Sequence, residues 1–272
     1  MPDRYKIGIV GLGAIGLQIA KTIDGGDLPN LDLAAVAARD KKKAQQNLGS
    51  FRNVPLITSV EGVCESADVI VECAPAAIFK TIIEKTVETG KTLIPASVGA
   101  LLPCLDLIDH AKSTGAKIII PTGALIGLDA VRAAAEGHIE TITLTTRKPP
   151  NGLAGAPYLI ENNISVGNLE DAKLVFEGSA RDGAKGFPAN VNVAAALSLA
   201  GIGPDKTQLQ IWADPSINRN MHTITVEADS ARFTMTIENI PTKENPKTGK
   251  ITALSLIAVS YTHLTLPTIL LV

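Results

Sequence analysis

The first forty residues alternate between short apolar runs and apolar positions spaced as one face of a helix. Ile7, Ile9 and Val10 form a short β-branched apolar run that predicts a buried strand. Ile15, Ile19 and Ile23 then recur every fourth residue, which indicates a helix packed by one side on that strand. The next apolar run, at 31–38, predicts a second strand parallel to the first. The chain therefore opens with a predicted strand–helix–strand unit.

Strand and helix patterns go on alternating as far as residue 121. We predict strands at 54–58, 67–73, 92–96 and 116–121, with helices at 75–89 and 105–113. Such alternation is typical of a parallel sheet with helices on both faces. Ligands of these sheets bind at the carboxyl ends of the strands, which makes Ala74, Ser97 and Ala124 candidates to contact a ligand. An ordinary turn explains each of these positions equally well.

After residue 123 the predicted strands have apolar residues on one face only. A helix predicted at 128–136 leads into 138–146, where polar and apolar residues alternate as in an antiparallel strand with one wet face. The following segment, 151–207, is rich in small residues and mostly helical in pattern. Further antiparallel strands are predicted at 208–213, 223–228 and 232–238.

Three glycines stand where the first strand pattern changes to the helix pattern. Gly11, Gly13 and Gly16 have the spacing G-x-G-x-x-G, with Ala14 and Ile15 before the last of them. Gly11 permits a tight turn, Gly13 lets the backbone approach a pyrophosphate, and Gly16 lets the helix pack closely on the strand. The N–H groups at the start of the helix then face the phosphates. We predict a dinucleotide site here, against the alternative of a glycine-rich turn that binds nothing.

These patterns predict a two-domain α/β protein. Residues 1–123 are expected to form a dinucleotide-binding Rossmann domain with a doubly wound parallel sheet, and residues 124–244 a second, α+β domain built on an antiparallel sheet. Residues 245–259, with Thr248 as N-cap, are expected to form a C-terminal helix that packs back on the first domain. The tail, 260–272, has no polar face, so we interpret it as foreign to the fold.

Two residues at the end of the second strand bear on the choice between NAD and NADP. Asp40 lies at the distance from the glycines where an acidic residue usually binds the ribose hydroxyl of NAD. Arg39 beside it can instead pair with the 2′-phosphate of NADP. We therefore predict NAD or NADP as the cofactor. The lysines at 41–43 are better explained as the solvated start of the next helix.

Composition excludes several classes of protein. The 272 residues carry a net charge of −2 and only 3% aromatic residues, so a nucleic-acid-binding surface is not expected. The three cysteines form no C-x-x-C pair, and their odd number fits a reducing compartment. No apolar run is long enough to span a membrane. We expect a cytoplasmic protein with a small-molecule substrate and no nucleic-acid, membrane or metal partner.

One histidine stands in polar surroundings. His222 ends a segment, 213–222, that is predicted to join two strands and contains Asp214, Asn218 and Asn220. Hydride transfer requires a proton acceptor, which near neutral pH is usually a histidine. We predict His222 as the catalytic base, oriented by Asp214 or a neighbouring asparagine, against the alternative of a structural loop histidine. The other histidines lie on a helix, at a strand start or in the tail: His110, His138 and His263.

Two further pairs of polar residues are candidates for binding. Asn190 and Asn192 lie where carboxamides can bond a nicotinamide amide or a substrate carboxylate, although helix capping is the simpler explanation of Asn190. Arg147 and Lys148 end a predicted strand and form a candidate clamp for a carboxylate, unless both are simply solvated.

A series of segments, found in the same order, resembles the L-aspartate dehydrogenase family from the first strand to about Ala258. They read GLGAIG at 11–16, SVGAL at 97–101, GALIGLDAV at 123–131, TTRKPP at 145–150, FEGSA at 176–180, FPANVNVAAALSLAG at 187–201, ADP and RNMH within 213–222, and ENPKTGKITALS at 244–255. The resemblance implies a homodimer that oxidises L-aspartate with NAD(P)+ to iminoaspartate, which hydrolyses to oxaloacetate and ammonia or feeds NAD synthesis. It also implies that Ala124 and Asn190 contact the nicotinamide and that His222 is the active-site histidine.

Two other functions stay open at this point. The substrate can be another small amino acid or a related intermediate, as in homoserine dehydrogenases and dihydrodipicolinate reductases, because nothing in the sequence measures the length of the pocket. The second open function is a nucleotide-sensing module without catalysis, whose second domain contacts a partner protein. Such a contact surface would be expected to expose aromatic residues, of which this chain has few. For aspartate, we predict that Lys148, Asn192 and Asn220 bind the substrate.

Overall fold

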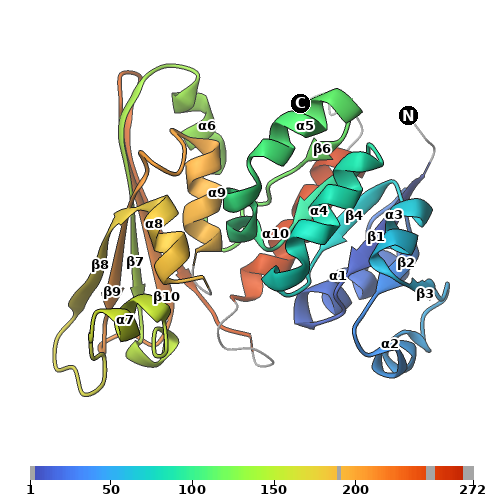
Figure 1. Ribbon diagram of the computed structural model, residues 1–272, viewed down its shortest axis with the longest axis horizontal. Coiled ribbons are helices and arrows are strands. Elements are labelled where there is room, and N and C mark those ends of the chain that lie inside the picture. The colour runs from blue at the N-terminus through green and yellow to red at the C-terminus, as the bar shows by residue number, and fades with distance from the viewer. Residues whose placement is uncertain (1–3, 189–190, 243–248, 266–272) are drawn as a thin grey trace. The chain divides into compact units, whose positions relative to one another are not determined.

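The computed structural model describes residues 4–188, 191–242 and 249–265, and its chain divides into two compact units (Figure 1). The first unit contains residues 1–121 together with 252–272, and the second contains residues 122–251. No helix in the described part of the chain is long and apolar enough to cross a membrane.

In the described part of the first unit, six parallel strands form a sheet in the order β3-β2-β1-β4-β5-β6. Helices lie on both of its faces, with α1 and α10 on one and α3 and α4 on the other (Figure 1). The elements are β1 (Tyr5–Val10), α1 (Ala14–Gly25), β2 (Leu31–Ala37), α2 (Lys41–Leu48), β3 (Leu56–Thr58), α3 (Val60–Ser66), β4 (Val69–Glu72), α4 (Phe79–Glu88), β5 (Thr92–Pro95), α5 (Asp106–Thr114), β6 (Lys117–Ile118) and α10 (Lys250–Ser260), with 3-10 turns at Ala76–Ile78 and Val98–Cys104.

The hydrophobic core of this unit contains residues from both ends of the described chain. Ile7 and Ile9 of β1 pack with Ile19 of α1, and Leu256 of α10 is fully buried in the same cluster. The helix continues past Ser260 as a π-helical turn, Tyr261–Thr265. Leu264, which belongs to the tail that the sequence pattern excludes from the fold, packs against this cluster.

The second unit is built on a mixed sheet rather than on the antiparallel sheet that the sequence predicts. Its described strands follow the order β11-β10-β7-β9-β8, and β7 pairs with β9 in parallel while the other neighbours are antiparallel. Strand β8 (Lys173–Ser179) lies in the segment predicted to be mostly helical. A bulge between Leu174 and Phe176 interrupts its alternation, which explains why the sequence pattern misses this edge strand.

Helices cover one face of this second sheet. Figure 1 shows α6, α8 and α9 along that face, where Leu144 of β7 and Val226 of β10 are completely buried. The elements are α6 (Leu128–Ala135), β7 (Ile139–Lys148), a 3-10 turn at Pro150–Gly152, α7 (Pro157–Glu161), β8, α8 (Ala180–Gly186), α9 (Asn192–Ala200), β9 (Gln208–Ala213), β10 (Asn220–Ala228) and β11 (Arg232–Asn239).

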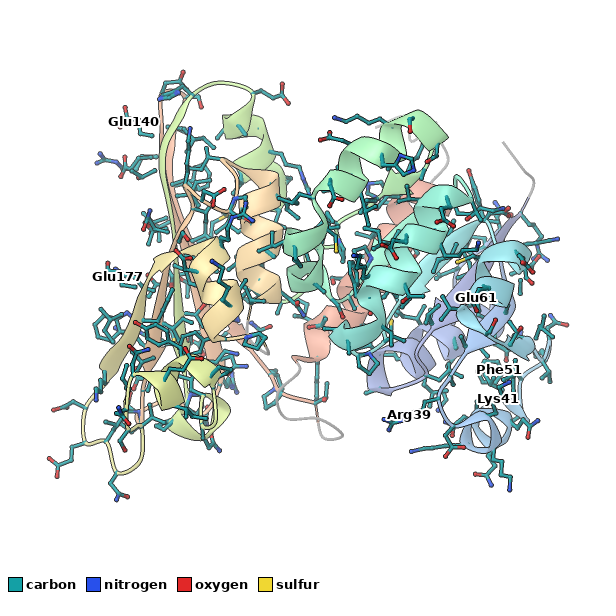
Figure 2. All side chains as sticks on the ribbon, in the orientation of Figure 1. Arg39, Lys41, Phe51, Glu61, Glu140 and Glu177 are labelled. Atoms are coloured by element: carbon teal, nitrogen blue, oxygen red, sulfur yellow. The ribbon has the colours of Figure 1, made fainter. Side chains whose placement is uncertain are left out.

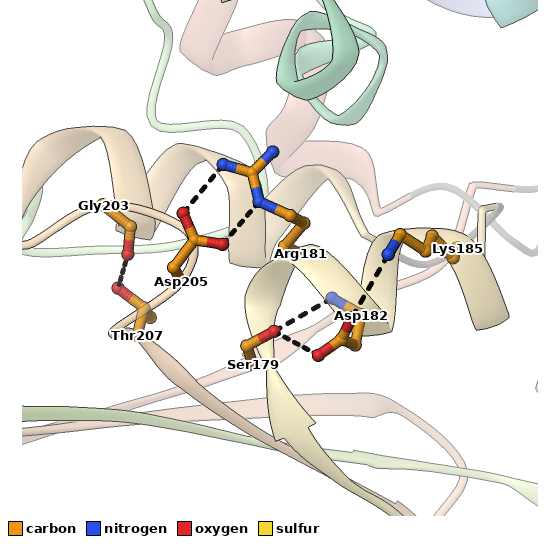
Figure 3. A network of polar contacts seen from close by, with 7 residues as sticks. All are labelled: Ser179, Arg181, Asp182, Lys185, Gly203, Asp205 and Thr207. Carbon is orange, nitrogen blue, oxygen red and sulfur yellow. Dashed lines mark hydrogen bonds and ion pairs between the residues drawn. The ribbon is translucent and has the colours of Figure 1, made fainter.

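A polar network holds the start of α8 beside the chain that leaves α9 (Figure 3). Ser179 caps α8 by accepting a hydrogen bond from the backbone N–H of Asp182 at 3.1 Å. Arg181 donates two hydrogen bonds to the carboxylate of Asp205, at 2.5 and 2.9 Å. This pair connects the first turn of α8 to the segment after α9, and Asp205 lies at the surface.

Candidate active site

The glycine turn after β1 is closely packed at two of its glycines and open at the third. Gly11 has φ +100°, and a Cβ there would collide with the carbonyl of Cys73 and lie 2.8 Å from the nitrogen of Ala74. A Cβ on Gly16 would overlap the carbonyl oxygen of Gly11, so only a hydrogen fits between α1 and the turn. A Cβ on Gly13 would meet nothing within 4 Å. The backbone at Gly13, at the N-terminus of α1, is therefore open on this side.

Ala74 and Ser97, predicted as cofactor contacts, are brought together at the ends of β4 and β5. Ser97 Oγ donates a 3.3 Å hydrogen bond to the carbonyl of Ala74, and both residues hydrogen-bond the carboxylate of Glu72. Burial raises the pKa of this carboxyl, and the N–H groups of Ser97 and Ala74 oppose the rise. Sequence analysis missed Glu72, although an acidic residue ending a strongly apolar strand is an available signal.

Arg39 and Asp40 differ in what they contact after β2. The carboxylate of Asp40 accepts a hydrogen bond from the backbone N–H of Lys43 at 3.0 Å and caps α2. Arg39 is exposed, projects from the ribbon (Figure 2), and forms no hydrogen bond or ion pair within the described residues. The acidic side chain is thus engaged locally, and the guanidinium is available to a ligand.

His222 lies within strand β10 and not in the preceding loop. It pairs in register with Thr146 of β7, and its Nδ1 lies 3.0 Å from Thr146 Oγ1. Its side chain turns to the helix-covered face, where His222 is 3% exposed. Lys148, two residues after Thr146 on the same face of β7, is 6% exposed. The second unit thus carries a buried cluster of three polar residues, Thr146, Lys148 and His222.

Burial and the charge of Lys148 lower the pKa of His222 to about 3. The imidazole is therefore neutral at physiological pH, and one ring nitrogen has an unprotonated lone pair. A neutral imidazole next to a buried ammonium can accept a proton while the ammonium holds an anion. This cluster therefore places a candidate base beside a candidate anion-binding group.

The predicted orienting residue of His222 is different from the one that the structure provides. Asp214 accepts hydrogen bonds from Ser216 Oγ at 2.6 Å and from Arg147 at 2.9 Å, and these contacts lower the pKa of its carboxyl. Thr146 contacts the imidazole instead. Thr146 continues the alternation of buried residues along β7, but its partner on β10 is 76 residues away, so local sequence does not reveal the pair.

Arg147 and Lys148 do not form a common clamp, because adjacent residues of a strand point to opposite faces. Arg147 lies over the ring of Trp212, with its guanidinium carbon 5.1 Å from the ring centre, and bonds Asp214. Of the two basic residues, Lys148 alone lies on the face that carries His222.

The remaining predicted residues have separate locations. The carbonyl of Ala124 accepts a 3.0 Å hydrogen bond from Asn239 Nδ2. Asn192 is the first residue of α9 and is exposed, and Asn220 is the first residue of β10 and is half-buried. Asn190 lies outside the described residues.

Both units match models of known protein families. Residues 11–121 match the model described as homoserine dehydrogenase, NAD binding domain. Residues 129–262 match the model described as aspartate dehydrogenase, C-terminal.

Relatives and solved structures extend the similarity over nearly the whole chain. The L-aspartate dehydrogenase of Bradyrhizobium diazoefficiens is 54% identical over 257 residues, which cover 94% of this chain and 91% of the relative. That of Methanosarcina mazei is 41% identical, with 93% and 94% covered. The crystal structure of aspartate dehydrogenase from Thermotoga maritima shares the fold, with a TM-score of 0.69 at 20% identity and coverage of 96% and 95%. The chain therefore belongs to the L-aspartate dehydrogenase family.

Proposed function

We propose that this protein is an NAD(P)-dependent L-aspartate dehydrogenase, which oxidises L-aspartate to iminoaspartate and, after hydrolysis, yields oxaloacetate and ammonia; it also runs the reverse reductive amination. The buried cluster of Lys148, His222 and Thr146, in a chain of this family, is the observation that carries the proposal. The homoserine dehydrogenase model matches the cofactor-binding half alone, whereas the half with this cluster matches aspartate dehydrogenase.

The first unit supplies the cofactor site in this proposal. Gly11, Gly13, Ala14, Ile15 and Gly16 would hold the pyrophosphate at the start of α1, which the open space at Gly13 supports. Ala74 and Ser97 would contact the cofactor at the strand ends, and the resemblance assigns nicotinamide contacts to Ala124 and Asn190. When bound, NAD(P)+ accepts the hydride that leaves Cα of the substrate.

The second unit supplies the substrate-binding groups and the base. Lys148 pairs with a carboxylate of aspartate, and Asn192 and Asn220 donate further hydrogen bonds. In this proposal His222 adopts the tautomer whose Nδ1–H donates to Thr146 Oγ1, 3.0 Å away, so that the lone pair of Nε2 accepts the proton of the substrate ammonium. Loss of that proton and of the hydride leaves iminoaspartate, to which water then adds as ammonia departs. A carboxylate beside Lys148 offsets the charge that lowers the pKa of His222, so substrate binding strengthens the base.

The test of the proposed function is a panel of amino acids offered with NAD+ and NADP+. We expect the highest kcat/KM for L-aspartate, because the buried Lys148 favours a second carboxylate over the hydroxyl of homoserine or the methyl of alanine. Absorbance of the reduced nicotinamide measures turnover. A higher kcat/KM for homoserine or alanine would contradict the assignment, and cofactor binding without any turnover would favour the sensing module.

Arg39 is proposed to set the use of NADP. Since Asp40 is engaged as the cap of α2, we expect the wild-type enzyme to use both cofactors and Arg39→Ala to raise KM for NADP+ by roughly ten- to hundredfold, with little change for NAD+. Lys41→Ala removes a neighbouring exposed charge (Figure 2) and serves as the matched control. Equal losses with both cofactors would mean a structural role for Arg39.

His222→Ala is expected to lose about 10²–10⁴-fold in kcat, because a positioned acid–base group is removed. The dissociation constant for the cofactor should stay near that of the wild type, since the glycine turn is untouched. His138→Ala removes an exposed histidine and should leave kcat unchanged. Turnover of His222→Ala at the wild-type rate would remove His222 from the mechanism.

The same variant tests the charge state of His222 through stability. The imidazole has a pKa of about 3 in the folded protein, against 6.5 for the ordinary group, so unfolding takes up a proton between these values. The free energy of unfolding of the wild type should therefore fall relative to His222→Ala as the pH drops from 6.5 toward 3, with no such difference in slope above 6.5. Parallel curves in urea titrations would mean a charged or solvated imidazole.

We further propose that the enzyme works in the cytoplasm as a homodimer formed through the second sheet. On the face opposite α6, α8 and α9, Thr143, Thr145, Gln210 and Thr223 are half-buried, and Thr145 bonds Gln210 at 3.2 Å. Such a polar face, whose side chains bond one another, suits an isologous contact with a second copy.

Sedimentation equilibrium should give twice the 28.4 kDa mass of the chain, and Thr143→Lys should shift the measured mass toward that of one chain. A wild type that sediments as a single chain would contradict the dimer.

A further inference from the structure

Glu72 is a fully buried carboxylate at the end of the central strand β4. It is 0% exposed, and it stands in register with Val10, the last residue of β1, and with Pro95, the last residue of β5. Glu72 therefore lies where three neighbouring strands, β1, β4 and β5, end together. Ligands of open parallel sheets bind at this edge.

Both oxygens of Glu72 accept hydrogen bonds from the two loops that begin there. Oε1 accepts from the backbone N–H of Ala74 at 2.8 Å and from Ser97 Oγ at 3.1 Å. Oε2 accepts from the backbone N–H of Ser97 at 2.9 Å. One side chain thus sets the distance between the loop after β4 and the loop after β5.

The loop after β4 in turn supports the glycine turn. Gly11 lies so close to Cys73 and Ala74 that a Cβ would collide with the Cys73 carbonyl. If Ala74 is displaced, the glycine turn, which holds the phosphates in the proposed function, must therefore shift as well. The contacts of Glu72 connect three loops, those after β1, β4 and β5.

Packing alone does not explain an acidic residue at this position. Burial of a carboxylate is costly unless it is hydrogen-bonded, and the described residues provide no ion pair to Glu72. An apolar side chain would fill the same space without that cost, but it would leave the N–H groups of Ala74 and Ser97 without an acceptor.

We propose that Glu72 is a positioning residue for cofactor binding, which holds Ala74, Ser97 and the glycine turn in the arrangement that receives NAD(P). The inference rests on the proposed function, in which these residues contact the cofactor. Glu72 itself touches neither cofactor nor substrate in this proposal and acts through the three loops.

Glu72→Gln is the sharpest variant, because it keeps the shape and changes one acceptor. If the amide oxygen occupies the Oε1 position, the amide nitrogen faces the N–H of Ser97; in the flipped orientation it faces the N–H of Ala74. Either way one backbone donor opposes another donor, and a loop must move. We expect the dissociation constant for NAD+ to rise about tenfold, as for one unsatisfied donor, and KM for the cofactor to rise more than kcat falls.

Thr86→Val is the matched control. Thr86 is also 0% exposed in the first unit, but its hydroxyl bonds the carbonyl of Ile82 within α4, away from the strand ends. It should lower the thermal midpoint while leaving the dissociation constant for NAD+ unchanged in isothermal titration. An equal loss of affinity in both variants, or wild-type affinity in Glu72→Gln, overturns the proposal.

Hydrogen exchange on the wild-type protein keeps the inference testable if Glu72→Gln does not fold. The amides of Ala74 and Ser97 should exchange as slowly as those of β4, and exchange at the rate of an open loop overturns the proposal. A wild-type enzyme that binds neither NAD+ nor NADP+ would instead refute the proposed function, whereas binding by the wild type with an unaffected variant refutes the role of Glu72 alone.

Discussion

The close approach of α1 to the turn after β1 is the constraint on which the first unit depends. Because a hydrogen is the largest group that fits between Gly16 and the carbonyl of Gly11, the helix starts directly above the end of the strand. This places the N-terminus of α1 beside the ends of β1 and β4. Only because the helix begins there do the contacts of Glu72 and the open space at Gly13 belong to the same edge of the sheet.

The sequence predicted this part of the fold well because its signals are local. The glycine spacing, the apolar run of β1 and the helical spacing of Ile15, Ile19 and Ile23 all fall within about twenty residues. The mixed sheet was not predicted, because the direction in which β9 joins β7 depends on a crossover of some sixty residues and on an edge strand whose bulge hides its alternation.

His222 and Lys148 of the candidate site were predicted singly, but Thr146, Glu72 and the contacts among these residues were not. His222 stood out by its polar neighbours along the chain, yet Asp214 bonds Arg147 and Ser216. Thr146 reaches the imidazole from another strand through the register of β7 and β10. Glu72 looked like part of an apolar strand, and the role proposed for it depends on donors of Ser97, 25 residues away, as well as on the nearby N–H of Ala74. Chain proximity pointed to His222, whereas strand pairing decided that its imidazole contacts Thr146.

The end of β7 has a consequence for how this chain can vary. Arg147 contributes to a stacked ion pair on one face, and Lys148 contributes a buried ammonium on the other. Deleting or inserting a single residue in β7 would exchange the two faces, so that each cation would lose its surroundings at the same moment. This strand is therefore expected to tolerate changes of residue type far better than changes of length, and insertions among homologues should gather in the loops on either side of it.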